Sequence, residues 1–226
     1  MLSAFIFFSK YKNNISNEFD RQEFTVKGVD LSHHNPIIDW ATVSDQDISF
    51  VYLKATGGVK HLDRNYPYNY KSAKSNNLRT GSYHFYLFGV SGRKQARHFI
   101  NTAKVETGDL IPAIDIEHSG DNPYSKDSTY NNLVIAELKN LENALYEYYG
   151  VRPILYTNRE CYKLYVQNNF SENYIWLCDL KNKPSDINNW IIWQFSHTGK
   201  LGEVKENIDL NYFRYSHDQL NKILMP

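Results

Sequence analysis

Short apolar runs rich in β-branched and aromatic residues recur along the chain from residue 24 onward, which is the pattern of buried strands. The sequence predicts eight strands, at residues 24–30, 49–56, 79–86, 110–117, 152–157, 174–180, 190–196 and 207–213. Segments with helical spacing lie between several of them, at residues 66–77, 92–105 and 130–149. The third segment is the clearest, and Gly150 directly after it is a typical residue to end a helix.

The order of these elements indicates the fold class. Alternating strands and helices in the first two-thirds of the chain predict parallel strands joined by crossover helices. The last three runs are joined by links too short for full helices. We therefore predict an α/β fold, an irregular TIM-like β/α barrel with eight strands and fewer than eight helices.

The first residues differ from the rest of the chain. Residues 1–8 are apolar but reach only about a third of the ~20 residues needed to span a bilayer, and residues 9–22 are polar without periodicity. We interpret residues 1–23 as a tether or the remnant of a truncated anchor, and residues 24–226 as one barrel domain. A chain of 226 residues fits one domain of this kind.

Composition narrows the function classes. Lys and Arg together number 25, as do Asp and Glu, so no net charge attracts a nucleic acid. The 18 Tyr, 12 Phe and 4 Trp supply many rings of the kind that line sugar-binding clefts, although most are expected in the core. Cys161 and Cys178 are too few for a disulfide framework and are interpreted as buried thiols or one bridge.

Carboxylates stand at the ends of two predicted strands and in the middle of the last one, and a β/α barrel gathers its reacting groups at strand ends. They are Asp30, Asp115, Glu117 and Asp209. Period-two alternation places Asp115 and Glu117 on one face of a strand, with Cα atoms roughly 6.6 Å apart. Mutual repulsion should raise one pKa and leave an acid beside an ionised partner, as glycoside hydrolysis requires. Side-chain rotamers span both the retaining and the inverting separation.

Seven ordered blocks between residues 27 and 213 resemble the glycoside hydrolase family 25 lysozymes, the Chalaropsis-type muramidases. The blocks are GVDLSHHNPIIDW, FVYLKATGG, TGSYHFY, IPAIDIE, RPILYTN, WIIWQFSHTGKLGEV and IDLNYF. The resemblance implies cleavage of the β-1,4 bond from N-acetylmuramic acid to N-acetylglucosamine in peptidoglycan, without a metal or organic cofactor. It also implies an irregular eight-stranded barrel acting outside the cytoplasm.

The resemblance assigns roles to the carboxylates. Glu117 matches the family's general acid and Asp115 its partner carboxylate, while Asp30 and Asp209 match two further aspartates. Whether Asp115 attacks the anomeric carbon or positions the substrate's 2-acetamido group stays open. We further expect sugar contacts from residues at or near strand ends, namely Tyr86, Tyr156, Trp176, Gln194 and His84.

The chain also departs from the family pattern. Gly57 stands where relatives commonly carry an acidic residue, His34 and Asn35 replace a Trp-Gln or similar pair, and WLCDL places Cys178 near the barrel rim. These departures leave the substrate preference open, although all four carboxylates remain.

Two other interpretations compete with a metal-free glycosidase. His33, His34, Asp115 and Glu117 are metal-ligand types, but no HExxH motif is present, and adjacent histidines at a strand end should point in opposite directions. A non-catalytic peptidoglycan-binding barrel is the second alternative. We expect a monomer without a membrane span or a nucleic-acid partner.

Overall fold

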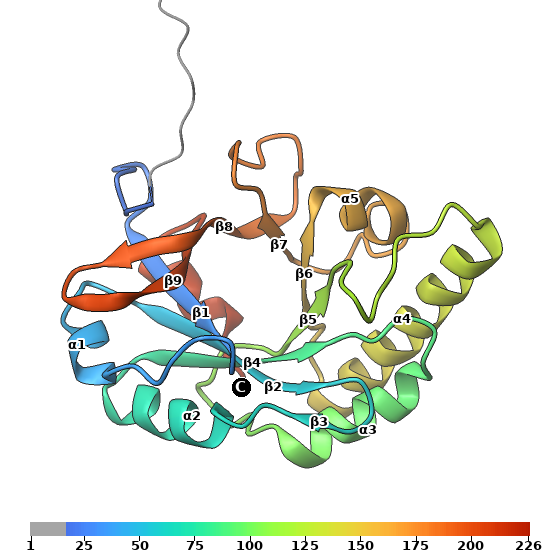
Figure 1. Ribbon diagram of the computed structural model, residues 1–226, viewed down its shortest axis with the longest axis horizontal. Coiled ribbons are helices and arrows are strands. Elements are labelled where there is room, and N and C mark those ends of the chain that lie inside the picture. Colours follow the sequence, from blue (N-terminus) through green and yellow to red (C-terminus); the bar gives the residue numbers. More distant parts are fainter. Residues whose placement is uncertain (1–16) are drawn as a thin grey trace, which may run out of the picture.

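Nine strands form one continuous sheet that curls into a barrel in the computed structural model, which describes residues 17–226 (Figure 1). The strands are β1 (Val26–Leu31), β2 (Phe50–Gly57), β3 (His61–Leu62), β4 (Arg79–Phe85), β5 (Ala113–Ile116), β6 (Ile154–Asn158), β7 (Ile175–Cys178), β8 (Trp190–Leu201) and β9 (Val204–Phe213). Their order is β1-β9-β8-β7-β6-β5-β4-β2-β3, and a further pairing of β1 with β2 closes the ring. The two-residue strand β3 stays outside, so eight strands form the barrel, as predicted.

Strand direction explains why the barrel is irregular. Pairing is parallel from β1 through β2, β4, β5, β6 and β7 to β8, whereas β9 is antiparallel to both β8 and β1. The hairpin from β8 to β9 turns at Gly202, whose φ of 50° lies in the left-handed region that glycine adopts without strain. Residues 197–206 extend this hairpin beyond the two runs that the sequence predicts.

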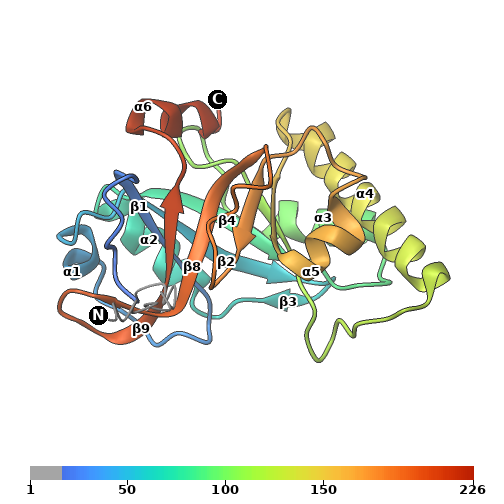
Figure 2. The same ribbon diagram turned by 90° about the horizontal axis from the view of Figure 1, so that it is seen from above.

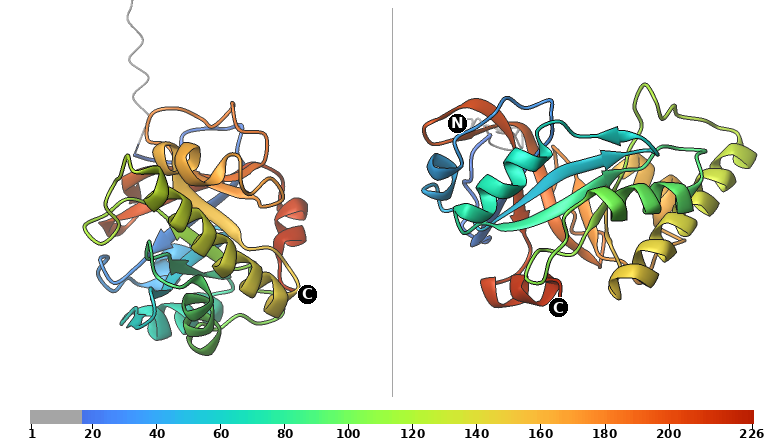
Figure 3. Two further views of the ribbon diagram at one scale, coloured as in Figure 1. Left: turned by 90° about the vertical axis from the view of Figure 1, so that its right-hand side faces the viewer. Right: turned by 90° about the horizontal axis from the view of Figure 1, so that it is seen from below.

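Six α-helices occur in residues 17–226, and they cover only part of the barrel. They are α1 (Trp40–Ser44), α2 (Tyr66–Ser75), α3 (Gly92–Thr102), α4 (Ser128–Tyr149), α5 (Arg159–Cys161) and α6 (His217–Leu220). A π-helical turn, Tyr162–Val166, follows α5, and a 3-10 turn, Asn221–Ile223, follows α6. The helices α2, α3 and α4 confirm the three predicted segments, and Gly150 ends α4 with a φ of 72°. Figures 1 and 3 show α1 to α4 along one side, with β8 and β9 outside that layer.

Two layers of apolar side chains result from the alternation of each strand. In β5, Ile114 and Ile116 face the outer layer beneath the helices, whereas Ala113 belongs to the cluster inside the barrel. The same alternation turns Asp115 toward the barrel interior. The fold therefore places a carboxylate beside apolar side chains inside the barrel.

The C-terminal segment closes one end of the barrel. Leu224 forms a β-bridge with Leu110, and the backbone of Met225 donates a hydrogen bond of 2.6 Å to the carbonyl of Asp109. Figure 2 shows α6 and the C-terminus together at this end. Since β9 runs antiparallel to its neighbours, the chain leaves it on the side where the parallel strands begin. The carboxyl ends of the parallel strands thus form the open end.

Residues 17–23, the described part of the predicted tether, lie against the β8–β9 hairpin. The Phe19 ring packs edge-on against Phe195 and Tyr212, with ring centres 5.6 and 5.3 Å apart. The backbone of Lys200 donates a hydrogen bond to the carbonyl of Asn17. Residues 1–16, which hold most of the predicted tether or anchor, lie outside the described residues. Within residues 17–226, none of the helices combines the length and apolar character that a membrane crossing needs.

The contact between α3 and α4 gives a test of the packing. A Cβ added to Gly92 would lie 1.9 Å from the carbonyl oxygen of Glu137 and 2.6 Å from the backbone nitrogen of Leu141. Because backbone atoms cannot move aside as a side chain does, Gly92→Ala should lower the free energy of unfolding by about 1–3 kcal/mol in denaturant titrations. The control is Gly120→Ala, whose Cβ would meet nothing within 4 Å. Equal stability of the two variants would contradict the close approach of the helices.

Candidate active site

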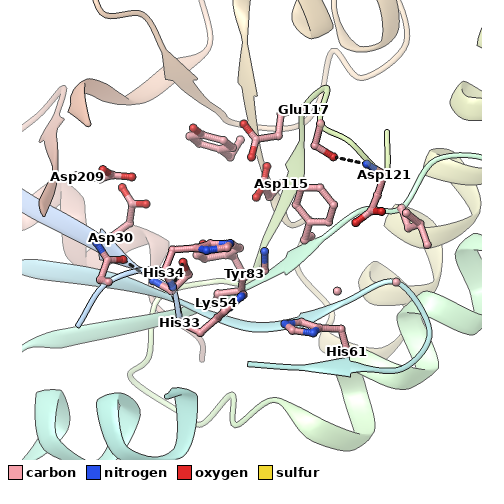
Figure 4. Close-up of a pocket in the computed structure, with 18 of the residues that line it drawn as sticks. Asp30, His33, His34, Lys54, His61, Tyr83, Asp115, Glu117, Asp121 and Asp209 are labelled. Carbon is pink, nitrogen blue, oxygen red and sulfur yellow. Dashed lines mark hydrogen bonds between the residues drawn. The ribbon is translucent and has the colours of Figure 1, made fainter. Parts of the chain in front are cut away.

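A cleft of about 840 Å³ opens at the carboxyl ends of the parallel strands, a volume typical of ligand sites. All four carboxylates from the sequence analysis line it, as Figure 4 shows. They are Asp30, Asp115, Glu117 and Asp209. The fold therefore brings together side chains that lie as much as 179 residues apart, since the first is residue 30 and the last is residue 209.

Asp30 and Asp209 reach the cleft from opposite chain directions. Asp30 lies near the carboxyl end of β1, and its register partner in the antiparallel strand β9 is Asp209. Because β9 runs the other way, its earlier residues are the ones nearest the rim. Asp30, Asp115 and Glu117 thus reach the cleft because they lie at the carboxyl ends of parallel strands. Asp209 reaches it because β9 runs antiparallel to them.

Two buried amides hold Asp30. Its Oδ2 accepts hydrogen bonds from Gln194 Nε2 at 2.8 Å and from Asn211 Nδ2 at 2.7 Å. Each amide is fixed in turn, since Gln194 Oε1 accepts from the Tyr156 hydroxyl and Asn211 Oδ1 accepts from the Trp176 indole, both at 2.7 Å. The orientation of Asp30 is therefore determined by a chain of hydrogen bonds through the barrel interior.

Asp115 lies in a different environment. Its side chain is buried, and its Oδ1 has no hydrogen-bond partner among residues 17–226. Burial and the charge of Glu117 raise the pKa of Asp115 well above its usual range, against the opposing effect of Lys54. Burial also raises the pKa of Glu117, which Lys54 again opposes. The pair thus favours holding a proton near neutral pH, as the sequence analysis expects from two close carboxyl groups.

The other two carboxyl groups also bind protons more tightly than usual. Burial raises the pKa of Asp30 to about 7, although its hydrogen bonds to Asn211 and Gln194 act in the opposite direction. Burial and the charge of Asp30 raise the pKa of Asp209 to about 9. The cleft therefore carries fewer than four negative charges at neutral pH.

Lys54 is the functional candidate that the sequence analysis missed. It lies in β2 and lines the cleft, with Nζ 4.5 Å from the centre of the Phe85 ring. Its positive charge lowers the pKa of both Asp115 and Glu117. A signal was present in the sequence, because a lysine inside the apolar run 49–56 needs a partner when it is buried.

Aromatic rings form the inner wall of the cleft. Tyr83, Tyr156 and Trp176 line it, and the Trp176 ring packs edge-on against Tyr156 with ring centres 4.8 Å apart. The structure thus places Tyr156 and Trp176 where the sequence analysis expects them. Gln194, also expected as a sugar contact, is instead buried beneath the cleft, where it contacts Asp30 and the Tyr156 hydroxyl.

Tyr86 and His84 do not lie in the cleft, which corrects their expected role as sugar contacts. Alternation along β4 turns Tyr83 and Phe85 toward the cleft and its neighbours toward the helices. The Tyr86 hydroxyl donates to the carbonyl of Val134 at 2.7 Å, beneath α4.

His84 is held in the outer layer by two polar neighbours. Its Nδ1 lies 2.7 Å from Thr56 Oγ1, and its Nε2 lies 3.1 Å from Gln95 Oε1. Burial lowers the pKa of His84 to about 3, so the ring is neutral at physiological pH. His84 therefore has a structural role between the barrel and α3.

The departures from the family pattern gather around the cleft. Gly57, His34 and Asn35 line it directly. Cys178 is buried next to His197, with Sγ 3.3 Å from Nε2, and burial raises the pKa of its thiol to about 12. Cys161 is also a buried free thiol, which confirms the first interpretation of the two cysteines.

The two adjacent histidines do not point in opposite directions as expected, because they lie in a turn after β1. The rings of His33 and His34 have centres 4.0 Å apart. Among residues 17–226, the group of possible metal ligands that the fold assembles consists of His33, His61 and Asp63. It includes neither Asp115 nor Glu117, so the carboxylate pair is separate from it.

An eight-stranded barrel with paired carboxylates at its open end has the general layout of a β/α-barrel hydrolase. Residues 29–204 match the model of the glycosyl hydrolases family 25. The chain belongs to this family and is a glycoside hydrolase.

Similar proteins cover most of the chain. A family 25 glycosyl hydrolase from Bacillus anthracis superposes with a TM-score of 0.83 at 31% identity, over 91% of this chain and 96% of that one. Lysozyme M1 of Streptomyces globisporus is 28% identical over 212 residues, which cover 86% of this chain and 70% of that protein. The uncharacterized protein YegX of Escherichia coli (strain K12) is 27% identical over 204 residues, 87% of this chain and 72% of its own.

The raised pKa of Asp209 gives a test with a definite sign. The folded state binds this proton more tightly than the unfolded chain, so the stability that the protonated acid contributes is fully present below pH 3.8 and is lost as pH rises toward 9. Asp209→Asn keeps the shape but cannot ionise. The variant should therefore exceed the wild type in free energy of unfolding by about 1 kcal/mol or more at pH 8 and by little at pH 4.

Denaturant titrations at both pH values would measure this difference. Glu203→Gln is the control, since Glu203 is exposed at the tip of the β8–β9 hairpin and outside the cleft. A gain for Asp209→Asn that is the same at pH 4 and pH 8 would show that ionisation of Asp209 does not destabilise the fold.

Proposed function

We propose that this protein is an N-acetylmuramidase, which hydrolyses the β-1,4 bond from N-acetylmuramic acid to N-acetylglucosamine in peptidoglycan. One observation carries the proposal. Glu117 and Asp115 are neighbouring, desolvated carboxyl groups with raised pKa values in a cleft lined by aromatic rings. Names of relatives, such as Lysozyme M1 and the N,O-diacetylmuramidase of Chalaropsis sp, support the same activity.

Glu117 is the proposed general acid. It lies just after β5, is partly exposed to the cleft, and its raised pKa favours the protonated form that must donate to the leaving oxygen. Water in the cleft can reach it again after the bond breaks, so that it can then act as the base.

Asp115 is the proposed partner carboxylate. Its Oδ1 has no hydrogen-bond partner among the described residues, so this oxygen is available to a substrate. Two roles suit it, attack on the anomeric carbon or acceptance of the N–H of the 2-acetamido group. In either role Asp115 reacts as an anion, and the positive charge of Lys54 favours that form.

The remaining cleft residues have proposed roles in holding the sugar. The rings of Tyr156 and Trp176 offer apolar faces of the kind on which sugar rings stack. Asp30 and Asp209 contribute acceptors for sugar hydroxyl groups on the opposite wall. All of these groups come from a single chain, so we propose a monomer that acts on peptidoglycan outside the cytoplasm and needs no cofactor.

Glu117→Gln tests the assignment of the acid. The amide keeps the shape of the side chain but cannot supply the proton, so turnover of purified peptidoglycan should fall about 10²–10⁴-fold while thermal unfolding stays close to the wild type. Products are reduced with borohydride and analysed by mass spectrometry. Fragments of the wild type should end in reduced N-acetylmuramic acid.

The matched control is Glu203→Gln, which makes the same chemical change outside the cleft and should leave turnover intact. A loss smaller than tenfold for Glu117→Gln would place the acid elsewhere. Fragments that end in N-acetylglucosamine would retain the glycosidase and change the bond. Sedimentation with the wall without new fragments would support a non-catalytic binding barrel instead.

Lys54→Met tests the electrostatics of the pair. Lys54 lowers the pKa of both Asp115 and Glu117, so its removal should raise both values. Asp115 then ionises only at higher pH, and Glu117 also keeps its proton to higher pH. Both limbs of the pH–rate profile should therefore move to higher pH.

Initial rates between pH 3 and pH 10 would measure the shift. Lys181→Met is the control, because Lys181 is exposed in the loop after β7 and does not line the cleft. An unchanged profile for Lys54→Met would mean that the charge of Lys54 does not act on the carboxylate pair.

A further inference from the structure

A second group of chemistry-bearing side chains lies at one edge of the cleft. His33 follows β1, His61 begins β3, and Asp63 follows β3. One possible ligand atom from each lies within 4.8 Å of those from the other two. In Figure 4, His61 lies on the far side of Lys54 from Glu117 and Asp115, so this group is separate from the proposed catalytic pair.

The short strand β3 is what places His61. Its two residues pair with the end of β2, where His61 is the register partner of Gly57. The pairing sets the His61 ring beside the ring of His33, with centres 5.1 Å apart. Both histidines line the open cleft, so an ion has free access to them.

Asp63 fixes the orientation of His33. The Asp63 side chain is buried, and its Oδ2 lies 2.8 Å from Nδ1 of His33 and accepts the backbone N–H of the same residue at 2.7 Å. Its Oδ1 accepts the backbone N–H of Asn65. A carboxylate beside Nδ1 favours the tautomer with its proton there, which leaves the Nε2 lone pair free. Histidines that bind metals in proteins usually have this support.

We propose that His33 and His61 bind one divalent transition-metal ion, through Nε2 of His33 and a ring nitrogen of His61. Asp63 is the positioning residue behind His33. Two ligand atoms at about 2.0–2.1 Å from one ion lie no more than about 4 Å apart. The possible ligand atoms here lie within 4.8 Å of one another, and the exposed His61 side chain can rotate to adjust its ring nitrogen. Imidazole ligands select Zn²⁺, Cu²⁺, Ni²⁺ or Co²⁺ over Mg²⁺ and Ca²⁺, and water completes the coordination on the cleft side.

This site does not depend on the proposed muramidase activity, so its test uses binding alone. Tag-free protein is titrated with ZnCl₂ in a calorimeter, and the Co²⁺-loaded protein is examined for visible absorption bands of a nitrogen-ligated ion. We expect one ion per chain. His61→Asn, and separately His33→Asn, should weaken zinc binding about 10–100-fold or more.

His217→Asn is the matched control, because His217 is exposed on α6 at the closed end of the barrel and should leave zinc binding unchanged (Figure 2). His61 is exposed, so its substitution should not disturb folding, which thermal unfolding verifies. Equal zinc affinity of His61→Asn and the wild type would overturn the site. Equal heats from MgCl₂ and ZnCl₂ would also overturn it, because imidazole ligands would then not be involved.

Discussion

The desolvation of four carboxyl groups at one end of a closed barrel is the constraint on which the rest of the structure depends. An ionised carboxylate loses its hydration when it is buried, and burial is the largest cause of the raised pKa at Asp30, Asp115, Glu117 and Asp209. The apolar interior that stabilises the barrel is therefore the same interior that keeps protons on these acids. Ionisation of these carboxyl groups therefore lowers the stability of the fold at this end of the molecule.

Asp30 and Asp115 differ in their hydrogen-bond partners. Asp30 receives two amide hydrogen bonds, and those amides are held by Tyr156 and Trp176, so its geometry is fixed before any ligand arrives. Asp115 has an oxygen without a partner among residues 17–226. A buried polar atom left unpaired costs about 1–3 kcal/mol, a cost that a substrate group can offset when it binds. Asp30 is therefore paired within the protein, whereas Asp115, which lines the cleft, keeps an acceptor oxygen that is unpaired within the described part of the chain.

Much of this arrangement could be predicted from the sequence, because strand periodicity and chain order carry the information. The eight runs, the three longer helices and the cleft positions of Asp30, Asp115 and Glu117 follow from local patterns. Tyr86 and His84 were misplaced because proximity to a strand end does not specify which face a side chain takes. Alternation from Tyr83 would have turned both of them away from the cleft.

Other features depend on contacts between distant segments, which no local pattern reveals. The antiparallel direction of β9, set by the hairpin from β8, pairs Asp30 with Asp209 when β9 meets β1. Lys54 is separated from Asp115 by 61 residues of sequence, since they are residues 54 and 115, and its effect is purely electrostatic.

The charged groups in the cleft do not shift the pKa of all four carboxyl groups in the same way. Lys54 lowers the pKa of Asp115 and Glu117, whereas the pKa shifts of Asp30 and Asp209 have other causes. The charge of Asp30 raises the pKa of Asp209 further. The two halves of the cleft therefore differ in kind. In one half Lys54 opposes the raised pKa values of Asp115 and Glu117, and in the other half hydrogen bonds from Asn211 and Gln194 oppose the raised pKa of Asp30.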